Sequence, residues 1–320
     1  MSESKYKNKK IYLAGHSGMV GSAIKRYLEK SGYNNLVFKS IDELDLIRQE
    51  KVETFFKQEK PEIVIIAAAR VGGILANNTY RAQFIYDNLM IESNLIHSSY
   101  QNNVEKLIFL GSSCIYPKLA QQPLKEEYLL SDYLESTNEP YAIAKIAGIK
   151  LCENYYRQYG CNFYSIMPTN MYGPNDNFDL NTSHVLPALL RKFHEAKINN
   201  SDSVTLWGTG TAQREFMYVD DLAEGLCYLL EKVDAKELYE QNLSFLNIGT
   251  GTDLTIMELA KIISNVVGFK GEIVYDRSKP DGTPRKLLDV ARINSLGWKA
   301  KTDLRLGIKV TYDWYLKNAK

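Results

Sequence analysis

A tyrosine and a lysine at a spacing of four, Tyr141 and Lys145, have the chemistry to pass a proton to a carbonyl oxygen. On a helix, that spacing places both side chains on one face. A phenol has an ordinary pKa of ~10 and is a poor acid near neutrality, but a neighbouring ammonium, together with an oxidised nicotinamide, would stabilise the phenolate and lower that pKa. The pair therefore indicates proton transfer coupled to hydride transfer at a carbonyl carbon. Because the chain has 22 tyrosines, an ordinary pair of exposed side chains remains the alternative.

Ser112 strengthens this interpretation because of its place in the sequence. The apolar run at residues 107–110 predicts a buried strand, and Gly111 ends it. Ser112 follows at the carboxyl end of that strand, which is the edge of a parallel sheet where ligands bind. A hydroxyl at this point can donate a hydrogen bond to the same carbonyl oxygen. Ser112, Tyr141 and Lys145 together predict a reductase site.

A glycine-rich turn near the N-terminus is typical of a dinucleotide-binding site. The turn lies between the expected strand at residues 11–14 and the expected helix at residues 19–30. Gly15 allows a tight turn, Gly18 lets the backbone approach a pyrophosphate, and Gly21 lets helix and strand pack closely. The pyrophosphate is then held by free N–H groups at the helix N-terminus. The spacing is GxxGxxG rather than GxGxxG, so a purely structural turn is the alternative.

The end of the second expected strand bears on the choice of cofactor. An acidic residue at this place favours NAD because it binds the ribose 2′-hydroxyl. This chain has Lys39 there, and the first acidic residue after the expected strand is Asp42. A lysine suits a 2′-phosphate better, so the sequence favours NADP; a solvated surface lysine is the alternative.

Apolar runs and helical patterns alternate through the first part of the chain. The runs are apolar throughout, which is typical of strands buried on both faces of a parallel sheet. Strand, helix and strand in succession imply right-handed crossovers. The expected strands are residues 11–14, 36–38, 63–67, 107–110 and 163–166, and the expected helices are residues 19–30, 51–58, 82–101 and 141–159. The sequence therefore predicts an α/β fold with a doubly wound parallel Rossmann sheet and a second, smaller α/β substrate domain.

The expected domain division follows a change in composition after Pro168. The second part is richer in Gly, Pro, Asn and Asp, and its apolar runs are short, at residues 204–207, 245–248 and 273–275. We expect residues 1–170 to form the NADP-binding Rossmann domain, with a return segment near residues 215–250. Residues 171–320 are expected to form mainly the substrate-binding domain.

Composition and charge exclude several classes of protein. The chain has 320 residues, 45% of them hydrophobic, and a net charge of +1, so it is neither disordered nor strongly basic, as nucleic-acid binders usually are. The longest apolar run, residues 63–69, is too short to cross a bilayer, which takes ~20 residues. The first ten residues are polar and lack the apolar core of a signal peptide. The four cysteines contain no CxxC pair, so we expect free thiols, a cytoplasmic location, and no metal site.

Motifs along nearly the whole chain resemble one family. GxxGxxG, Ser112, Tyr141 and Lys145 are similar to the extended short-chain dehydrogenase/reductase superfamily. Within it, longer segments resemble the GDP-L-fucose synthase family: GHSGMVGSAI, AAARVGGILANN, LGSSCIYPK, EPYAIAKIAGIKLCE, MPTNMYGPNDNF, SHVLPALLRKFHEA, WGTG, REFMYVDD and SKPDGTPRKLLDV. The resemblance implies reduction of GDP-4-keto-6-deoxy-D-mannose with NADPH after inversion of C3 and C5. It also implies a homodimer.

The resemblance implies that Cys114 and His184 are the acid and base of the two inversions. A C4 ketone acidifies the hydrogens on C3 and C5, and each inversion needs a base on one face and an acid on the other. A thiol with a pKa of ~8.5 and an imidazole with a pKa of ~6.5 both exchange protons near neutrality. The alternatives are a buried apolar Cys114 and a His184 that only begins a helix. Which of the two serves each carbon stays open.

The expected binding residues combine the glycine turn and Lys39 with positions that the resemblance implies. The expected cofactor contacts are Gly15, His16, Ser17, Gly18, Met19, Val20, Gly21, Lys39, Ile41, Asp45, Leu46, Leu110, Gly111, Ser112, Ser113, Lys145, Pro168, Thr169, Asn170, Met171 and His184. The expected substrate contacts are Lys192, Trp207, Arg214 and Asp281. Arginine is suited to bidentate binding of a phosphate. Core packing is the alternative for Trp207, and a role in the Pro-Asp-Gly turn is the alternative for Asp281.

Some positions depart from the family pattern. The family commonly has arginines for the adenosine 2′-phosphate where this chain has Ser17 and Ile41, which leaves the preference between NADPH and NADH open. Lys192 stands where the family can have arginine, so the planar fork is lost while the charge is kept. The nearest alternative function is a GDP-L-colitose-type reductase, which acts on a 3-deoxy substrate and inverts C5 only. A nucleotide-sensing module on the same fold is disfavoured, because it has no need for all five catalytic side chains.

Overall fold

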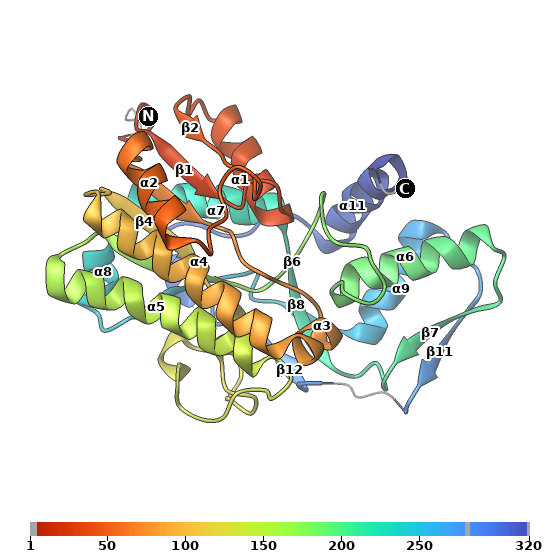
Figure 1. Cartoon of the computed structure of the whole chain (residues 1–320). Helices are drawn as coiled ribbons and strands as arrows, with labels where there is room; N and C mark the ends of the chain where they lie inside the picture. The colour runs from red at the N-terminus through yellow and green to blue at the C-terminus, as the bar shows by residue number, and fades with distance from the viewer. Residues whose placement is uncertain (1–4, 279–281, 319–320) are drawn as a thin grey trace.

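The computed structural model describes residues 5–278 and 282–318, and a parallel sheet lies at its centre (Figure 1). Six strands form this sheet in the order β2-β1-β3-β4-β5-β9, and every neighbouring pair is parallel. The strands are β1 (Ile11–Ala14), β2 (Leu36–Val37), β3 (Ile63–Ile66), β4 (Lys106–Leu110), β5 (Phe163–Pro168) and β9 (Leu246–Ile248). The residues of β1, β3, β4, β5 and β9 are buried throughout, as their apolar runs predict.

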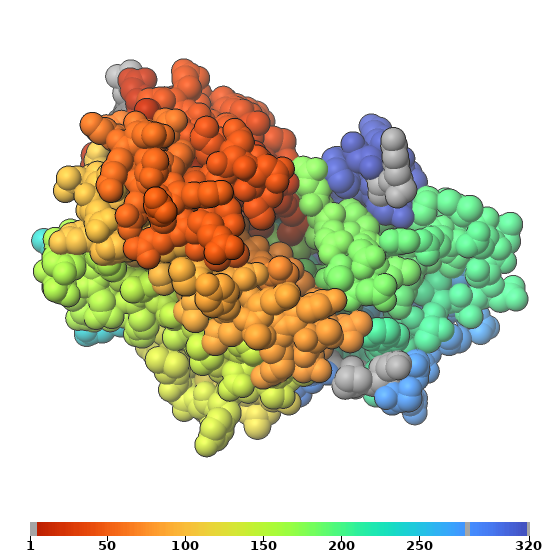
Figure 2. Space-filling model, in the orientation of Figure 1, coloured from red at the N-terminus to blue at the C-terminus, as the bar shows by residue number. Residues whose placement is uncertain are grey.

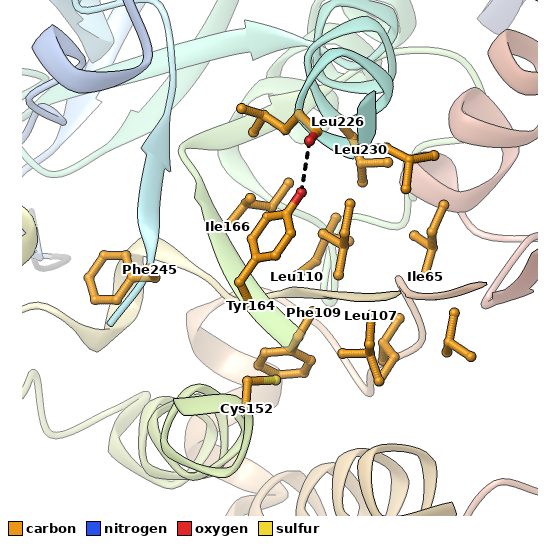
Figure 3. Close-up of a cluster of buried hydrophobic side chains, with 14 of the residues drawn as sticks. Ile65, Leu107, Phe109, Leu110, Cys152, Tyr164, Ile166, Leu226, Leu230 and Phe245 are labelled. Carbon is orange, nitrogen blue, oxygen red and sulfur yellow. Dashed lines mark hydrogen bonds between the residues drawn. The ribbon is translucent and has the colours of Figure 1, made fainter. Parts of the chain in front are cut away.

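Helices cover both faces of the sheet. On one face α1 (Met19–Lys30) packs on α7 (Val219–Lys232), and on the other α4 (Arg81–Gln101) packs on α5 (Glu139–Tyr159) and α2 (Gln49–Glu59). Figure 3 shows the sheet between α7, with Leu226 and Leu230, and α5, with Cys152. The Tyr164 hydroxyl donates to the Leu229 carbonyl at 3.0 Å and so ties β5 to α7. The predicted α/β class with a doubly wound parallel sheet is confirmed.

The strand order places a crevice between β1 and β3. The chain runs from β1 outward to β2 and then returns to β3 on the other side, so the loops after β1 and β3 diverge at this point. Such a switch point, beyond the carboxyl ends of the strands, is where doubly wound sheets bind ligands. The loops after β4 and β5 open onto the same edge.

A second hydrophobic core lies beside the sheet. It is formed by α6 (Val185–Ile198), α9 (Ile256–Val267), α11 (Leu304–Asn318) and residues of several short strands. The strands of this region are β6 (Asn170–Tyr172), β7 (Ser203–Trp207), β8 (Gln213–Tyr218), β10 (Asp253–Thr255), β11 (Glu272–Asp276) and β12 (Arg285–Lys286). The remaining helices are α3 (Ile74–Thr79), α8 (Ala235–Tyr239) and α10 (Ala291–Ser295), with 3-10 turns at Ser113–Ile115 and Glu126–Tyr128. Figure 2 shows a notch between the two parts.

The second part of the chain is more helical than the sequence indicates. Only short apolar runs were expected there, whereas α6, α7, α9 and α11 have 14, 14, 12 and 15 residues. Their apolar residues recur every three or four positions, as Leu259, Ile263 and Val267 do in α9, so they form stripes rather than runs. A capping box, with Thr255 bonded to Glu258, marks the start of α9 and was overlooked.

The helices and the potential metal-binding side chains of residues 5–278 and 282–318 bear on two classes of function. No helix of this part is long and apolar enough to span a membrane. The same residues hold no group of three or more His, Cys, Asp or Glu side chains arranged to bind a metal ion.

Candidate active site

The start of α5 presents Tyr141 and Lys145 to the carboxyl edge of the sheet. Pro140 occupies the first turn of the helix, where its fixed φ and missing N–H are tolerated. Lys145 is buried, and its Nζ donates to the Leu110 carbonyl at 3.0 Å. The same Nζ lies 4.4 Å from the centroid of the Phe109 ring and 5.9 Å from that of Tyr141. The end of β4 therefore fixes the ammonium beside the phenol.

Ser112 joins the two kinds of chemistry in the site. Its hydroxyl is hydrogen-bonded to the Tyr141 phenol and to the Cys114 thiol, and its Oγ accepts from the Cys114 backbone N–H at 3.5 Å. It occupies the N-cap of the 3-10 turn that follows β4. One hydroxyl thus lies between the predicted proton donor of the reduction and a predicted acid–base group of the inversions.

Within the chain itself the pKa of Tyr141 is raised, whereas the predicted lowering depends on an oxidised nicotinamide as well as on Lys145. Burial is the largest cause, and the charges of Cys114 and Glu92 add to it, whereas the hydrogen bond with Ser112 lowers it. Desolvation of the phenolate outweighs the neighbouring ammonium in this chain. Tyr141 is accordingly neutral near pH 7, which is the form that can donate a proton to a developing alkoxide.

Cys114 is a buried free thiol within reach of two ammonium groups. Burial raises its pKa, and the hydrogen bond with Ser112 and the charges of Lys286 and Lys145 oppose that rise. A buried apolar cysteine has no such neighbours, so the surroundings favour the acid–base alternative.

His184 is positioned by a loop that packs on the segment after β3. It lies directly before α6, and its backbone carbonyl accepts from the N–H of Ala188. The Gly73 N–H donates to the Thr182 carbonyl at 2.8 Å, and a Cβ at Gly73 would lie 2.5 Å from the Ser183 carbonyl oxygen. His184 is exposed at the surface, although many protein atoms lie around its imidazole. Desolvation by these atoms is the larger cause and the charge of Lys286 the smaller cause of its lowered pKa, which favours the neutral imidazole.

Lys286 is the residue that the sequence interpretation missed. It interacts electrostatically with Cys114, His184 and Arg214. The parallel pairing of β12 with β8 places it opposite Arg214. Its pKa is lowered, chiefly by burial. The only signal in the sequence was its place in the segment SKPDGTPRKLLDV, because an isolated lysine in an irregular segment has no diagnostic spacing.

The expected substrate residues lie on the second core. The Lys192 Nζ, from α6, lies 5.3 Å from the Trp207 ring centroid at the end of β7. Trp207 is 56% exposed, so its ring is a surface rather than part of the core. Arg214 donates from Nη1 to the Gln213 carbonyl at 2.7 Å. Asp281, the fourth expected contact, lies outside the described residues.

The glycine turn is shaped for an approaching phosphate. Gly15 has a φ of +87°, and a Cβ there would lie 2.6 Å from the Ala68 backbone nitrogen. A Cβ at Gly21 would lie 2.0 Å from the Gly15 carbonyl oxygen, so helix and turn are in direct backbone contact. Gly18, by contrast, has only the Gly15 carbonyl oxygen near the Cβ position, at 3.7 Å, and it precedes α1. This cradle fits a dinucleotide pyrophosphate.

Other expected cofactor contacts lie along the same edge of the sheet. Those at the end of β4 and after it are Leu110, Gly111, Ser112 and Ser113, and those at the end of β5 and after it are Pro168, Thr169, Asn170 and Met171. Thr169 and Asn170 donate from their side chains to the Glu215 carbonyl, at 3.2 and 2.7 Å, which fixes this loop against β8.

The expected adenosine end follows β2. Lys39 forms an ion pair with Glu43 at 3.9 Å, and Ile41 is 76% exposed. Asp45 accepts from the Ile47 N–H, and the Leu46 carbonyl accepts from Asn94. Lys39 is the cation predicted to meet the 2′-phosphate, and it already forms an ion pair with the Glu43 carboxylate.

Comparison with known proteins identifies relatives over almost the entire chain. Residues 11–249 match the NAD dependent epimerase/dehydratase family. The chain is 57% identical over 313 residues to GDP-L-fucose synthase of Escherichia coli (strain K12), which covers 97% of each protein. It is 41% identical over 308 residues to GDP-L-colitose synthase of Yersinia pseudotuberculosis, covering 96% of this chain and 98% of that protein. The structure of a GDP-mannoheptose C4 reductase from Campylobacter jejuni with NADP bound is 46% identical, has a TM-score of 0.90, and covers 97% of this chain and 99% of that chain.

Proposed function

The chain belongs to the NAD dependent epimerase/dehydratase family, and we propose that it converts GDP-4-keto-6-deoxy-D-mannose to GDP-L-fucose. The proposed reaction inverts C3 and C5 of the sugar and then reduces the C4 ketone with NADPH. The full-length similarity to a GDP-L-fucose synthase supports this choice of substrate. Among the observations on the chain itself, the main support is that Ser112 is bonded to both Tyr141 and Cys114, because this brings the reducing and the epimerising groups into one site.

Cys114 and His184 are proposed to carry out the inversions. In each inversion one group removes the proton from the carbon beside the ketone, and the other returns a proton to the opposite face. Removal of the proton leaves an enolate with negative charge on the C4 oxygen. Lys286, which interacts with both Cys114 and His184, is a cation suited to stabilise that charge and the thiolate.

Tyr141 is proposed to donate the proton in the reduction. NADPH, when bound, supplies the hydride that adds to C4, and the C4 oxygen then needs a proton. The neutral phenol of Tyr141 gives that proton, Ser112 holds the oxygen by a hydrogen bond, and Lys145 stabilises the resulting phenolate. The bond of Lys145 to the Leu110 carbonyl keeps the ammonium in place for this step.

The glycine cradle and the loops after β4 and β5 are proposed to hold the cofactor. Gly15, Gly18 and Gly21 shape the cradle for the pyrophosphate, as the backbone contacts of Gly15 and Gly21 indicate. Lys39 is proposed to meet the adenosine 2′-phosphate in place of the missing arginines. Its ion pair with Glu43 predicts a modest preference for NADPH, because the carboxylate competes for the same charge.

The domain division and assembly also belong to this proposal. Residues 1–170, with the return segment near residues 215–250, are proposed to bind the cofactor, and residues 171–320 mainly the GDP-sugar through Lys192, Trp207, Arg214 and Asp281.

The chain is proposed to act in the cytoplasm as a homodimer. On α4, Phe84 and Leu95 are buried within the chain and Ile85, Leu89 and Ile91 are half-buried. A hollow of about 320 Å³ beside Ile85, also lined by Ile143 of α5, is the apolar surface that α4 and α5 leave open.

Product identification tests the proposal. The purified protein is incubated with NADPH and GDP-4-keto-6-deoxy-D-mannose, and the product is analysed by NMR. We expect oxidation of NADPH and formation of GDP-L-fucose. An unchanged cofactor signal refutes the reductase, and preference for a GDP-4-keto-3,6-dideoxy sugar identifies the colitose-type alternative instead.

A further inference from the structure

A carboxyl group that the proposed mechanism does not use interacts electrostatically with Lys145. Glu92 is on α4, is 1% exposed, and faces the helix α5 that carries Tyr141 and Lys145. No side chain among the described residues donates a hydrogen bond to either of its carboxyl oxygens. A buried carboxyl without a side-chain partner is costly in its ionised form, so its presence near a reactive pair calls for a physical explanation.

The packing around Glu92 is built for close approach to α5. Gly148 lies on α5 one turn after Lys145, and a Cβ there would lie 3.0 Å from the Glu92 carboxyl carbon and 2.5 Å from the Phe109 ring. The Lys145 ammonium lies over the same Phe109 ring, at 4.4 Å from its centroid. Figure 3 shows Phe109 beside Cys152 in this space. The absence of a side chain at Gly148 lets the carboxyl, the ring and the ammonium share one dry region between α4 and α5.

The electrostatic neighbours of Glu92 come from α5. Lys145 stabilises its ionised form, and its negative charge in turn raises the proton affinity of Lys145, Tyr141 and Cys152. The helix α2, which packs on another side of α4, buries the apolar side chains Val52, Phe55 and Phe56. Burial raises the pKa of Glu92 to about 8, with Lys145 and the Gly148 amide opposing the rise. Near pH 7 the carboxyl is therefore mostly protonated, and it becomes negative in mildly alkaline solution.

We propose that Glu92 is a positioning residue for the reduction, which sets the charge of Lys145 and, through it, the proton affinity of Tyr141. In the protonated form Glu92 adds no negative charge beside Tyr141, so it does not oppose formation of the phenolate. As the pH rises, Glu92 ionises and keeps Lys145 in its ammonium form. The Lys145 ammonium therefore persists to higher pH than it would without Glu92, while the net charge of the pair falls from +1 to 0 as Glu92 ionises.

The test compares two variants. Glu92→Gln keeps the shape of the side chain but removes its ionisable carboxyl group, and Glu153→Gln is the matched control. Glu153 is also a buried glutamate, but it is paired with Lys150 at 2.8 Å and Arg157 at 2.9 Å on the far part of α5. Loss of the Glu92 charge lowers the proton affinity of both Lys145 and Tyr141. The alkaline limb of the pH profile of kcat for C4 reduction should therefore move to lower pH. At a pH on that limb, kcat of the variant should be roughly threefold or more below that of the wild type. The limb of Glu153→Gln should match that of the wild type.

A measurement without substrate tests the titration itself. A carboxyl with a raised pKa binds its proton more tightly in the folded chain than in the unfolded one. Wild-type stability therefore falls, relative to Glu92→Gln, as the pH rises from the ordinary glutamate value of 4.5 to about 8. The Tm of Glu92→Gln minus that of the wild type should increase over this range and then level off.

The outcomes separate this inference from the proposed function on which it rests. An active wild-type enzyme with an unchanged alkaline limb in Glu92→Gln, or a Tm difference that does not vary with pH, overturns the role of Glu92 alone. A wild-type protein that does not oxidise NADPH refutes the proposed function, whatever the Tm difference shows. If Glu92→Gln does not fold, Glu92→Asp retains a carboxyl one methylene farther from Lys145. It should move the limb in the same direction by less, and a limb equal to the wild type's overturns the inference.

Discussion

Tyr141 and Lys145, which are proposed to carry out the reduction, share one helix, whereas Cys114 and His184, which are proposed to carry out the inversions, come from two separate loops. The first pair is fixed by helix geometry and by the bond from Lys145 to the Leu110 carbonyl. The second pair depends on a 3-10 turn after β4 and on a loop before α6. If the proposed roles hold, the reduction depends on a single helix and the end of β4, whereas the inversions depend on how the second core packs beside the sheet.

The largest effect is expected from removing the Lys145 ammonium, which belongs to the pair proposed for the reduction. Lys145→Met keeps the length of the side chain but not its charge or its bond to Leu110. We expect the rate of NADPH oxidation to fall by about 10³-fold, because the Tyr141 phenolate loses its neighbouring cation. Deuterium exchange from D₂O at C3 and C5, measured by mass spectrometry, should fall far less. An equal loss of both would mean that the two sides are not separable.

The converse change addresses the epimerising side. Cys114→Ser replaces the thiol by a much weaker acid, so exchange at C3 or C5 should fall by about 10²-fold. Binding of NADPH, followed by fluorescence titration, should be nearly unchanged because Cys114 is not among the expected cofactor contacts. Wild-type exchange in this variant would exclude Cys114 from the inversions.

Lys286 sharpens the comparison because it reaches the epimerising pair from a third segment, β12. Its charge opposes the rise in the pKa of Cys114 that burial causes, so Lys286→Met raises that pKa further. Less thiolate is then present near neutrality, and exchange should fall roughly tenfold and recover as the pH is raised. A pH profile of exchange identical to the wild type's would show that Lys286 does not act on Cys114.

The smallest effect is expected at the cofactor end, far from both pairs. Lys39→Met removes the predicted cation for the 2′-phosphate, and a single exposed ion pair contributes only about 1 kcal/mol or less. The ratio of kcat/KM for NADPH to that for NADH should therefore fall by about fivefold or less. A ratio unaffected by the change would show that Lys39 does not replace the missing arginines.

The placement of Tyr141 and Lys145 near the end of β4 is well predicted from the sequence, because the signals for these elements are local. The run of buried residues in β4 and the spacing of Tyr141 and Lys145 need no knowledge of distant contacts. The boundaries of α1 and β1 were obtained in the same way and agree with the structure. The direction of the Tyr141 pKa was not predictable, because it depends on how deeply the phenol is buried.

The surroundings of Cys114 and His184 and the second core were predictable only in part. Lys286 is placed by the parallel pairing of β12 with β8, and Glu92 by the packing of α4 on α5, and neither pairing leaves a pattern along the chain. The helices of the second core were missed because their apolar stripes do not form continuous runs. Cys114 and His184 were named through family resemblance, since a lone thiol and a lone imidazole have no diagnostic spacing.

Tyr141→Phe, incubated in D₂O with NADPH and the 4-keto sugar and analysed by NMR, tests the separation of the two sides most directly. We expect the keto sugar to gain deuterium at C3 and C5 at close to the wild-type rate while NADPH stays reduced. Loss of exchange in step with loss of reduction would contradict it, because Tyr141 would then serve the inversions as well.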